Sequence, residues 1–102
     1  MRHRASRVCL AALAAVFANL SAMAATPEEG QAVYNENCAS CHGEGLRNPG
    51  SSFDLKQLKP SEKDRFIRSV LAGKNQMPPW KGVLSGSELD ALWVYIQENA
   101  EN

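Results

Sequence analysis

The apolar positions of this chain fall into three helical stretches, separated by two long polar segments and preceded by an apolar N-terminus. The first stretch opens with Thr26-Pro27-Glu28-Glu29. Thr26 is a suitable N-cap, Pro27 suits the first helical position, and Glu29 can complete a capping box. We therefore expect a helix from about Pro27 to the cysteine segment. Gly30 lies inside this helix, where it costs about 1 kcal/mol relative to Ala, so its presence predicts the close approach of another helix.

Two further helices follow from the spacing of apolar residues. Those between positions 66 and 71 recur at i, i+1, i+4 and i+5, which is typical of an amphipathic helix. We expect this helix to begin after an N-cap at Ser61 and to stop at Gly73. The last helix should follow an N-cap at Ser85 or Ser87, with an apolar face formed by Leu89, Leu92, Trp93 and Ile96.

The segments between these helices have the composition of loops. Residues 43–53 and 75–85 are rich in Gly, Pro, Asn and Ser and show no apolar period, and residues 54–58 form at most one short helical turn. No strand-like alternation is present. The fold class is therefore all-α, with three main helices joined by long loops. Tyr34, Trp93 and Tyr95 are expected to seal the first helix against the last.

The N-terminus has the organisation of a secretory signal peptide. Three arginines within residues 2–7 precede an apolar run at residues 8–20, and a small-residue site follows at residues 22–24. The run is shorter than the ~20 residues that a membrane-spanning helix needs. An uncleaved membrane anchor is the alternative. A lipoprotein is a weaker one, because Cys9 opens the apolar run, whereas a lipidated Cys would close it.

Composition becomes informative once residues 1–24 are set aside as the signal peptide. The whole chain has 102 residues, with 11 basic and 11 acidic side chains and no formal net charge. The remaining domain, residues 25–102, keeps eight basic and all 11 acidic residues, which gives −3, together with one His, one Met and two Cys. This acidic balance argues against nucleic-acid binding. Export implies a periplasm or an equivalent oxidising space, and the small size excludes a barrel or a doubly wound sheet.

The two remaining cysteines form the segment Cys38-Ala39-Ser40-Cys41-His42, which is the C-x-x-C-H signal for attachment of a c-type haem. Two thioether bonds to the haem vinyl groups need sulfurs three residues apart at the end of a helix. The adjacent His42 can then turn its imidazole under the ring and bind the iron. We therefore expect one covalent haem c, held through Cys38 and Cys41, with His42 as a metal ligand. Such a haem would also supply the core that so small a domain lacks.

Three other interpretations of this segment are open. A redox-active C-x-x-C of the thioredoxin type normally accompanies a βαβ pattern, and no strands are expected here. Structural zinc needs four ligands, whereas this segment and the rest of the domain offer three Cys or His side chains. A plain disulfide between Cys38 and Cys41 is the third alternative.

Met77 is the expected sixth ligand of the iron. His42 is the single His of the exported domain and Met77 its single Met. Two prolines follow Met77 and hold it in a stiff, non-helical segment. Met is also a common core filler, Lys74 and Lys81 are substitute ligands at high pH, and an open sixth position is the remaining alternative. Met/His coordination raises the reduction potential and leaves little room for a substrate, which indicates an electron carrier and not an enzyme.

Further contacts with the cofactor are expected from the loops. Arg47 and Trp80 are candidates to bond the haem propionates, although Arg47 can equally be a solvated loop charge. A carbonyl of the Asn48–Pro49 region is expected to accept the second N–H of His42. A basic docking face is also possible from Lys56, Lys59, Lys63, Arg65 and Lys74. The residues expected to pack in the haem pocket or core are Phe53, Leu55, Leu58, Phe66, Val70 and Leu71.

In this order, three motifs resemble the class I c-type cytochromes over nearly all of residues 25–102: Gly30-x3-Tyr34-x3-Cys38-x2-Cys41-His42, then Met77-Pro78, then Leu92-Trp93-x-Tyr95-Ile96. The short stretch between His42 and Met77 is similar to that of small bacterial monohaem members. The resemblance implies crossing terminal helices around one haem with an exposed edge. It also implies that Cys38 and Cys41 attach the haem, that His42 is the proximal ligand and that Met77 is the distal one.

The expected function is transport of single electrons between periplasmic donor and acceptor proteins, by a monomer without stable membrane insertion after cleavage. The run from Gly73 to Trp80 also resembles small cytochromes that accept electrons from quinoprotein alcohol dehydrogenases, and a terminal oxidase is an expected acceptor. Two alternatives remain. One is a haem subunit of an oxidoreductase complex, and the other is a ligand-binding or peroxidatic haem protein with a labile Met77.

Overall fold

The computed structural model of the chain describes residues 24–101, which fold into helices and loops. The predicted signal peptide, with Cys9, lies outside the described residues except for Ala24. The helices are α1 (Pro27–Asn37), α2 (Ala39–His42), α3 (Lys63–Ala72) and α4 (Gly86–Glu98). Three 3-10 turns accompany them, namely η1 (Glu44–Leu46), η2 (Leu55–Gln57) and η3 (Pro60–Glu62).

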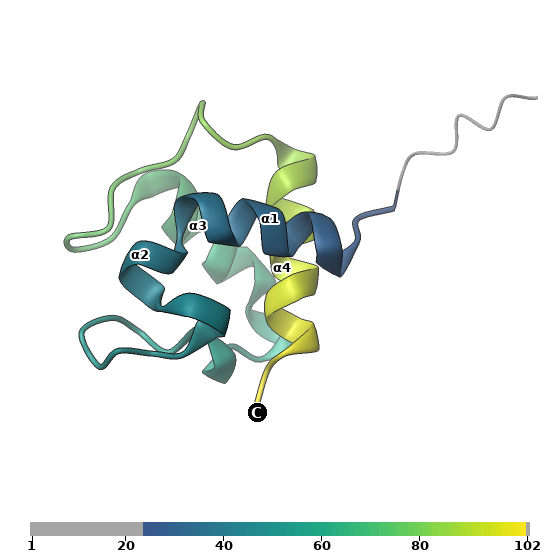
Figure 1. Cartoon of the computed structure of the whole chain (residues 1–102). Helices are drawn as coiled ribbons and strands as arrows, with labels where there is room; N and C mark the ends of the chain where they lie inside the picture. The colour runs from purple at the N-terminus through teal and green to yellow at the C-terminus, as the bar shows by residue number, and fades with distance from the viewer. Residues whose placement is uncertain (1–23, 102) are drawn as a thin grey trace, which may run out of the picture.

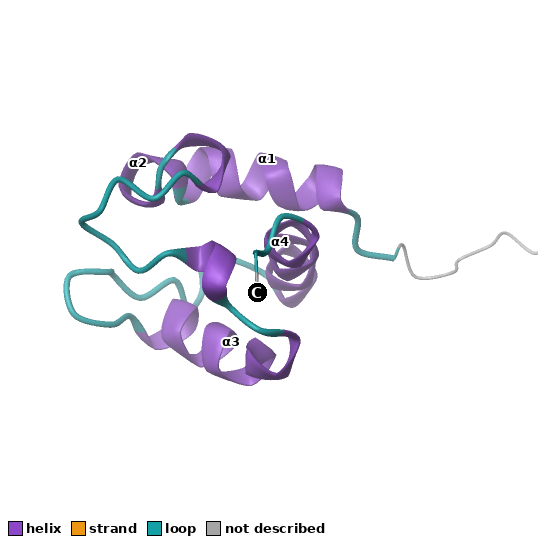
Figure 2. Ribbon diagram, turned by 90° about the horizontal axis from the view of Figure 1, so that it is seen from below, coloured by secondary structure: helices purple, strands orange, loops and turns teal. Residues whose placement is uncertain are grey.

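The prediction of an all-α fold with three main helices is confirmed, and α2 adds a single turn. Across residues 24–101 the only strand-like pairing is one isolated bridge between Lys74 and Met77. None of the helices in this part of the chain has the length and apolarity that crossing a membrane requires. Figure 2 shows α1 and α2 on one side of the molecule and α3 on the other, with α4 beside them at one end. Both long loops extend toward the opposite end, next to α2 (Figure 1).

The centre of the fold is the crossing of α1 over α4 (Figure 1). Gly30 lies at this crossing, where a Cβ atom would stand 2.0 Å from the carbonyl oxygen of Ala91 and 2.7 Å from the Cβ of Tyr95. These separations are far inside van der Waals contact, so the two backbones meet because residue 30 has no side chain. The close approach predicted from Gly30 is therefore confirmed.

The helix ends agree with the sequence at α1 and α4. Thr26 Oγ1 accepts a hydrogen bond from Glu29 N–H at 3.2 Å. At α4, Ser85 Oγ accepts from Glu88 N–H at 3.1 Å, and Glu88 Oε1 accepts from Ser85 N–H at 2.8 Å. Ser85 is thus the N-cap, with a complete capping box.

The expected N-cap at Ser61 is wrong. Pro60 begins η3, so Ser61 lies inside a 3-10 turn and lacks the extended backbone of a cap. The extended residue is Lys59, whose N–H donates to Glu62 Oε1 at 2.9 Å. The stop at Gly73 is confirmed, since Gly73 ends α3 with a φ of 80°.

Aromatic side chains join the helices in two pairs. The rings of Tyr34 and Tyr95 lie 5.4 Å apart between α1 and α4, as expected. Trp93 packs against Phe66 of α3, with ring centroids 5.1 Å apart, so it also joins α4 to α3. It lies two residues before Tyr95 on α4, which turns the two side chains toward different neighbours. The largest fully buried side chains of the core are Tyr34, Leu46, Leu92 and Ile96.

The crossing generates a prediction for Gly30→Ala. The added methyl would collide with backbone atoms of α4, and overpacking of this kind destabilises by roughly 1–3 kcal/mol. We expect the upper end of that range in urea unfolding of the haem-loaded protein, because backbone cannot move aside as a side chain can. Gly86→Ala is the matched control, since a Cβ at this helical position meets nothing within 4 Å. A Gly30→Ala protein as stable as the Gly86→Ala protein would contradict the steric argument.

Candidate functional site

A cleft of about 1010 Å³ lies between α2 with the loop after it and α3 with the loop after it. It is at the upper end of ordinary ligand pockets, which span roughly 300–1,000 Å³. Of the predicted site residues, it brings together Cys38, Cys41, His42, Pro49, Met77 and Trp80. Arg47 is exposed and is not among the lining residues.

The C-x-x-C-H segment is positioned by the continuation of α1 into α2. Cys38 N–H donates to the carbonyl of Tyr34 at 2.8 Å, and His42 N–H donates to the carbonyl of Cys38 at 2.9 Å. The helical turn places Cys38 and Cys41 three residues apart on one face. Both thiols are free, with Cys38 half-buried and Cys41 exposed. Burial, with a smaller contribution from Cys41, raises the pKa of the Cys38 thiol to about 11. Because neither thiol is in a disulfide, both sulfurs are available for thioether bonds.

His42 is held in one orientation by its ring nitrogen Nδ1, which lies 3.3 Å from the carbonyl oxygen of Phe53. A carbonyl can only accept, so Nδ1 carries the proton and Nε2 keeps its lone pair. Burial lowers the pKa of His42, opposed by the bond to Phe53, and this favours the neutral imidazole that metal binding needs. From the sequence we expect the accepting carbonyl in the Asn48–Pro49 region. This expectation is wrong, because the carbonyl belongs to Phe53. The loop runs past these residues and returns to His42 only at Phe53.

The loop of residues 43–53 is folded back onto α2. Tyr34 donates its hydroxyl to the carbonyl of Gly43 at 2.5 Å, and Ser52 donates its hydroxyl to the carbonyl of Cys41 at 2.9 Å. Burial, first, and then Cys38 and Tyr95 raise the pKa of Tyr34 to about 12, so its hydroxyl remains a donor. This long loop is therefore a support for the haem-attachment segment.

Gly43 makes the return of this loop possible. Its φ is 94°, and a Cβ atom there would lie 1.7 Å from the carbonyl oxygen of Arg47. The backbone of Arg47 thus packs against Gly43, while its exposed side chain lies outside the cleft lining.

Met77 lies in a second folded-back loop. Lys74 N–H donates to the carbonyl of Met77 at 3.1 Å, and Met77 N–H donates to the carbonyl of Lys74 at 2.9 Å. Gly73 has a φ of 80°, and a Cβ there would stand 2.8 Å from the carbonyl oxygen of Met77. The side chain of Met77 is half-buried and lines the cleft.

The far end of this loop is tied to the last turn of α3. Trp80 N–H donates to the carbonyl of Val70 at 2.9 Å, and Lys81 N–H donates to the carbonyl of Leu71 at 3.3 Å. These bonds occupy carbonyls that a helix end otherwise leaves unpaired. Residues 73–81 therefore form a closed loop that presents Met77 at a fixed place.

Arg65 lines the cleft, and the sequence analysis did not predict this role. Its guanidinium lies 5.4 Å from the ring centroid of Phe53 and forms an ion pair with Glu62 at 2.7 Å. Arg65 lines the cleft with Phe66 and Ser69 of the same helix. The spacing i, i+1, i+4 was a usable signal, because the helical period that predicts a buried Phe66 also places residues 65 and 69 beside it.

The five basic residues considered for a docking face do not form one patch around the cleft. Arg65 and Lys74 line the cleft. Lys56 pairs with Glu101 at 3.6 Å and Lys63 with Asp90 at 3.2 Å, both toward α4.

The side chains of the cleft fit a covalently held haem. They provide two free thiols at helical spacing, a neutral imidazole and a thioether. Trp80 and Arg65 add an indole and a guanidinium. The apolar walls, which suit a flat hydrophobic ring, include Leu55, Leu58, Phe66, Leu92 and Ile96.

Comparison with known proteins agrees with this assignment. The family model described as cytochrome C oxidase, cbb3-type, subunit III matches residues 25–96. A cytochrome c6 of Synechocystis sp. is 30% identical over 91% of this chain and 82% of its own length. A cytochrome c-555 of Methylococcus capsulatus is 32% identical over 99% of this chain and 90% of its own. The Cbb3-type cytochrome c oxidase subunit FixPc of Rhizobium leguminosarum is 32% identical over 68% of this chain but only 26% of its own length.

These matches cover the C-x-x-C-H segment, and the first two relatives match nearly the whole described chain. They favour haem attachment over the thioredoxin-like, zinc and disulfide interpretations. The chain therefore belongs to the class I c-type cytochromes, in the group of small monohaem electron-transfer proteins that carry covalently bound haem c.

Proposed function

We propose that this cytochrome is a periplasmic carrier of single electrons, in which His42 and Met77 are the axial ligands of the iron. The observation that carries the proposal is that one cleft receives both side chains, each from a separate loop-supported element. When bound, the haem supplies reversible exchange of one electron between its ferric and ferrous states.

The contacts of His42 support its role as proximal ligand. The bond from Nδ1–H to the carbonyl of Phe53 orients the ring and leaves Nε2 as the free donor atom. Such a bond to a metal-ligating imidazole fixes its tautomer and strengthens it as a ligand. Phe53 belongs to the same loop in which Ser52 holds the carbonyl of Cys41. Attachment and ligation are therefore supported together.

The closed loop around Met77 supports its role as distal ligand. Reciprocal backbone bonds with Lys74 and the bonds at Trp80 and Lys81 hold the backbone of Met77 in place, and its side chain lines the cleft. A thioether favours the reduced iron and raises the potential. A ligand held this firmly leaves no ready position for a substrate, which supports a carrier and not a peroxidatic enzyme.

The proposed location and partners extend the sequence interpretation. A signal peptide at residues 1–24 would deliver the chain to the periplasm, where a quinoprotein alcohol dehydrogenase is the proposed donor and a terminal oxidase the proposed acceptor. The donor proposal rests on the run from Gly73 to Trp80. In the structure this run also holds the backbone of Met77 in place. A direct test mixes the oxidised protein with a purified quinoprotein alcohol dehydrogenase and its substrate, and we expect reduction within the turnover time of the enzyme. Failure of that enzyme to reduce the protein, while small reductants do so, would remove this donor.

A second candidate function is a haem subunit of an oxidase complex. It is favoured by the family model described for the cbb3-type oxidase subunit and by the match to FixPc. Size-exclusion chromatography of an untreated periplasmic extract separates the two functions. A free carrier should elute at the mass of the small domain, whereas a subunit should co-elute with the oxidase.

The ligand assignment predicts the behaviour of Met77→Ala. The haem should stay covalently attached, because neither Cys38 nor Cys41 is changed. The potential should fall by on the order of 100 mV, since axial ligands set haem potentials over a range of about 0.8 V. Loss of the Met–iron charge-transfer band in the ferric spectrum reports the ligand directly. Gln76→Ala, in the same turn, should keep both properties. A Met77→Ala protein with an unchanged spectrum and potential would exclude Met77 as the ligand.

The placement of the two arginines predicts different effects on the potential. Arg65 lines the cleft, so its positive charge disfavours the oxidised iron. Arg65→Ala should lower the potential by roughly a few tens of mV, a modest shift because the guanidinium is partly exposed and screened. Arg47→Ala should leave it unchanged within error. Redox titration at two salt concentrations checks both, and a larger shift for Arg47→Ala would restore the sequence-based assignment.

A further inference from the structure

Met77 closes a tight turn whose two central residues are Asn75 and Gln76. Lys74 and Met77 exchange both of their backbone hydrogen bonds, with the Lys74 N–H donating at 3.1 Å and the Met77 N–H at 2.9 Å, and they form an isolated antiparallel bridge. This is the bonding pattern of a two-residue hairpin. Because the turn ends at Met77 itself, its shape decides where that side chain goes.

The register of this hairpin selects the side on which the thioether lies. Residues directly opposite each other in an antiparallel pair present their side chains on the same face. Lys74 and Met77 both line the haem cleft, in agreement with this geometry. A slip of one residue would turn a side chain to the opposite face. Met77 therefore reaches the cleft only while the turn keeps two central residues.

Asn75 supplies the unusual backbone that such a turn needs. Both common types of two-residue hairpin require a positive φ at the first central residue. Asn75 has a φ of 57°, and Leu46 is the only other residue of 24–101, apart from glycines, with a positive φ. Gln76, at the second central position, is not among them. Asn enters the left-handed region more readily than most residues with a side chain, so it suits this position.

The ends of the loop are held on both sides of this turn. A Cβ atom at Gly73 would lie 2.8 Å from the carbonyl oxygen of Met77, and the Trp80 N–H donates to α3 at 2.9 Å. The two prolines between Met77 and Trp80 each have a fixed φ. A residue that resists a positive φ at position 75 therefore cannot be accommodated by a shift elsewhere in the loop. The strain is relieved when the turn opens and Met77 leaves the cleft.

We propose that Asn75 is a positioning residue for Met77, whose left-handed backbone closes the turn and thereby sets how strongly the thioether is held at the iron. The inference rests on the proposed role of Met77 as the distal ligand. A side chain that resists a positive φ favours the open loop, in which the sixth position is free for another ligand. The apparent affinity for such a ligand rises in proportion to the open population. Competition for the iron therefore reports on the conformation of residue 75.

The test is a titration of the ferric, haem-loaded protein with imidazole, followed through loss of the Met–iron charge-transfer band. Asn75→Ala should bind imidazole roughly 5- to 10-fold more tightly than the parent, because an ordinary residue resists the left-handed region. Asn75→Val should bind it roughly 10- to 30-fold more tightly, because a β-branched residue is a genuine outlier there. Asn75→Gly should stay within about threefold of the parent, because Gly adopts a positive φ freely.

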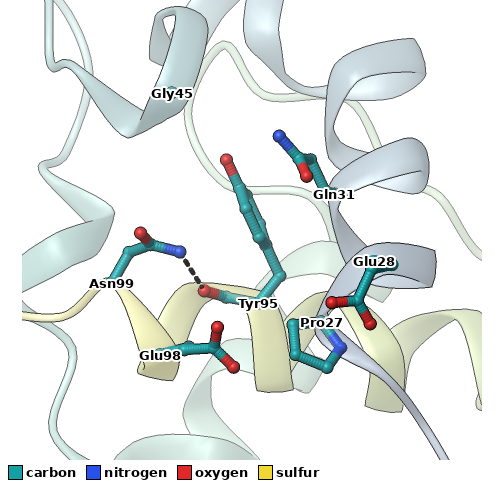
Figure 3. Close-up of a pocket in the computed structure, with 7 residues that line it drawn as sticks. All are labelled: Pro27, Glu28, Gln31, Gly45, Tyr95, Glu98 and Asn99. Atoms are coloured by element: carbon teal, nitrogen blue, oxygen red, sulfur yellow. Dashed lines mark hydrogen bonds between the residues drawn. The ribbon is translucent and has the colours of Figure 1, made fainter.

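Gln76→Ala and Gln76→Val are the matched controls, because residue 76 lies in the same turn without a positive φ. Both should bind imidazole as the parent does. A distant control is Glu98→Gln, in the small cleft at the crossing of α1 and α4 (Figure 3), which shares no lining residue with the haem cleft. Equal tightening in the variants of residues 75 and 76 would mean a general loosening of the loop and would overturn the proposal.

Asn75→Gly and Asn75→Ala together decide between the backbone and the side chain of residue 75, even where Asn75→Val does not mature. If the Gly variant binds imidazole as tightly as the Ala variant, the lost side chain is responsible and the proposal is overturned. A parent protein without the charge-transfer band would exclude Met77 as the ligand and overturn the proposed ligation together with this inference. A parent with the band, and an Asn75→Ala protein of unchanged affinity, would overturn this inference alone.

Discussion

The backbone contact between α1 and α4 at Gly30 is the constraint on which the rest of this structure depends. Because residue 30 has no Cβ, α1 rests directly on the backbone of Ala91. One turn later Tyr34 is fully buried, and its hydroxyl reaches the carbonyl of Gly43 at the end of α2. The helix crossing therefore sets the position of α2 and of the C-x-x-C-H segment on it. A wider crossing would withdraw Tyr34 and leave α2 without its anchor.

The two loops that support His42 and Met77, the proposed haem ligands, use the same device. Each begins at a glycine that ends a helix with positive φ, 94° at Gly43 and 80° at Gly73. In each, a Cβ atom would strike the carbonyl oxygen four residues later, that of Arg47 or of Met77. The chain can thus turn back onto the helix it has just left. The turn brings Phe53 to His42 in one loop and Met77 to the cleft in the other.

Local signals were enough to predict much of this arrangement. The helices, the role of Gly30, the haem-attachment segment and the position of Met77 in a stiff loop all depend on residues within a few positions of one another. The predictions were wrong where a contact depends on how a loop folds back onto residues far away in the sequence. The carbonyl that accepts from His42 belongs to Phe53, 11 residues away. The arginine that lines the cleft is Arg65 on α3, although Arg47 is nearer to the C-x-x-C-H segment in sequence. The predicted N-cap at Ser61 was wrong because the 3-10 turn already begins at Pro60, one residue before Ser61.

The bonds that position the ligands are mostly made by backbone atoms. The imidazole of His42 donates to the backbone carbonyl of Phe53, and Met77 is held by backbone bonds at Lys74, Trp80 and Lys81. Backbone groups are the same in every residue except proline, so the surrounding side chains can change without loss of this support. This accounts for relatives that match nearly the whole chain at 30–32% identity. A particular residue type is required only at a few positions. These are the glycines where a Cβ atom would clash, and the positions that supply a thiol, an imidazole or a thioether.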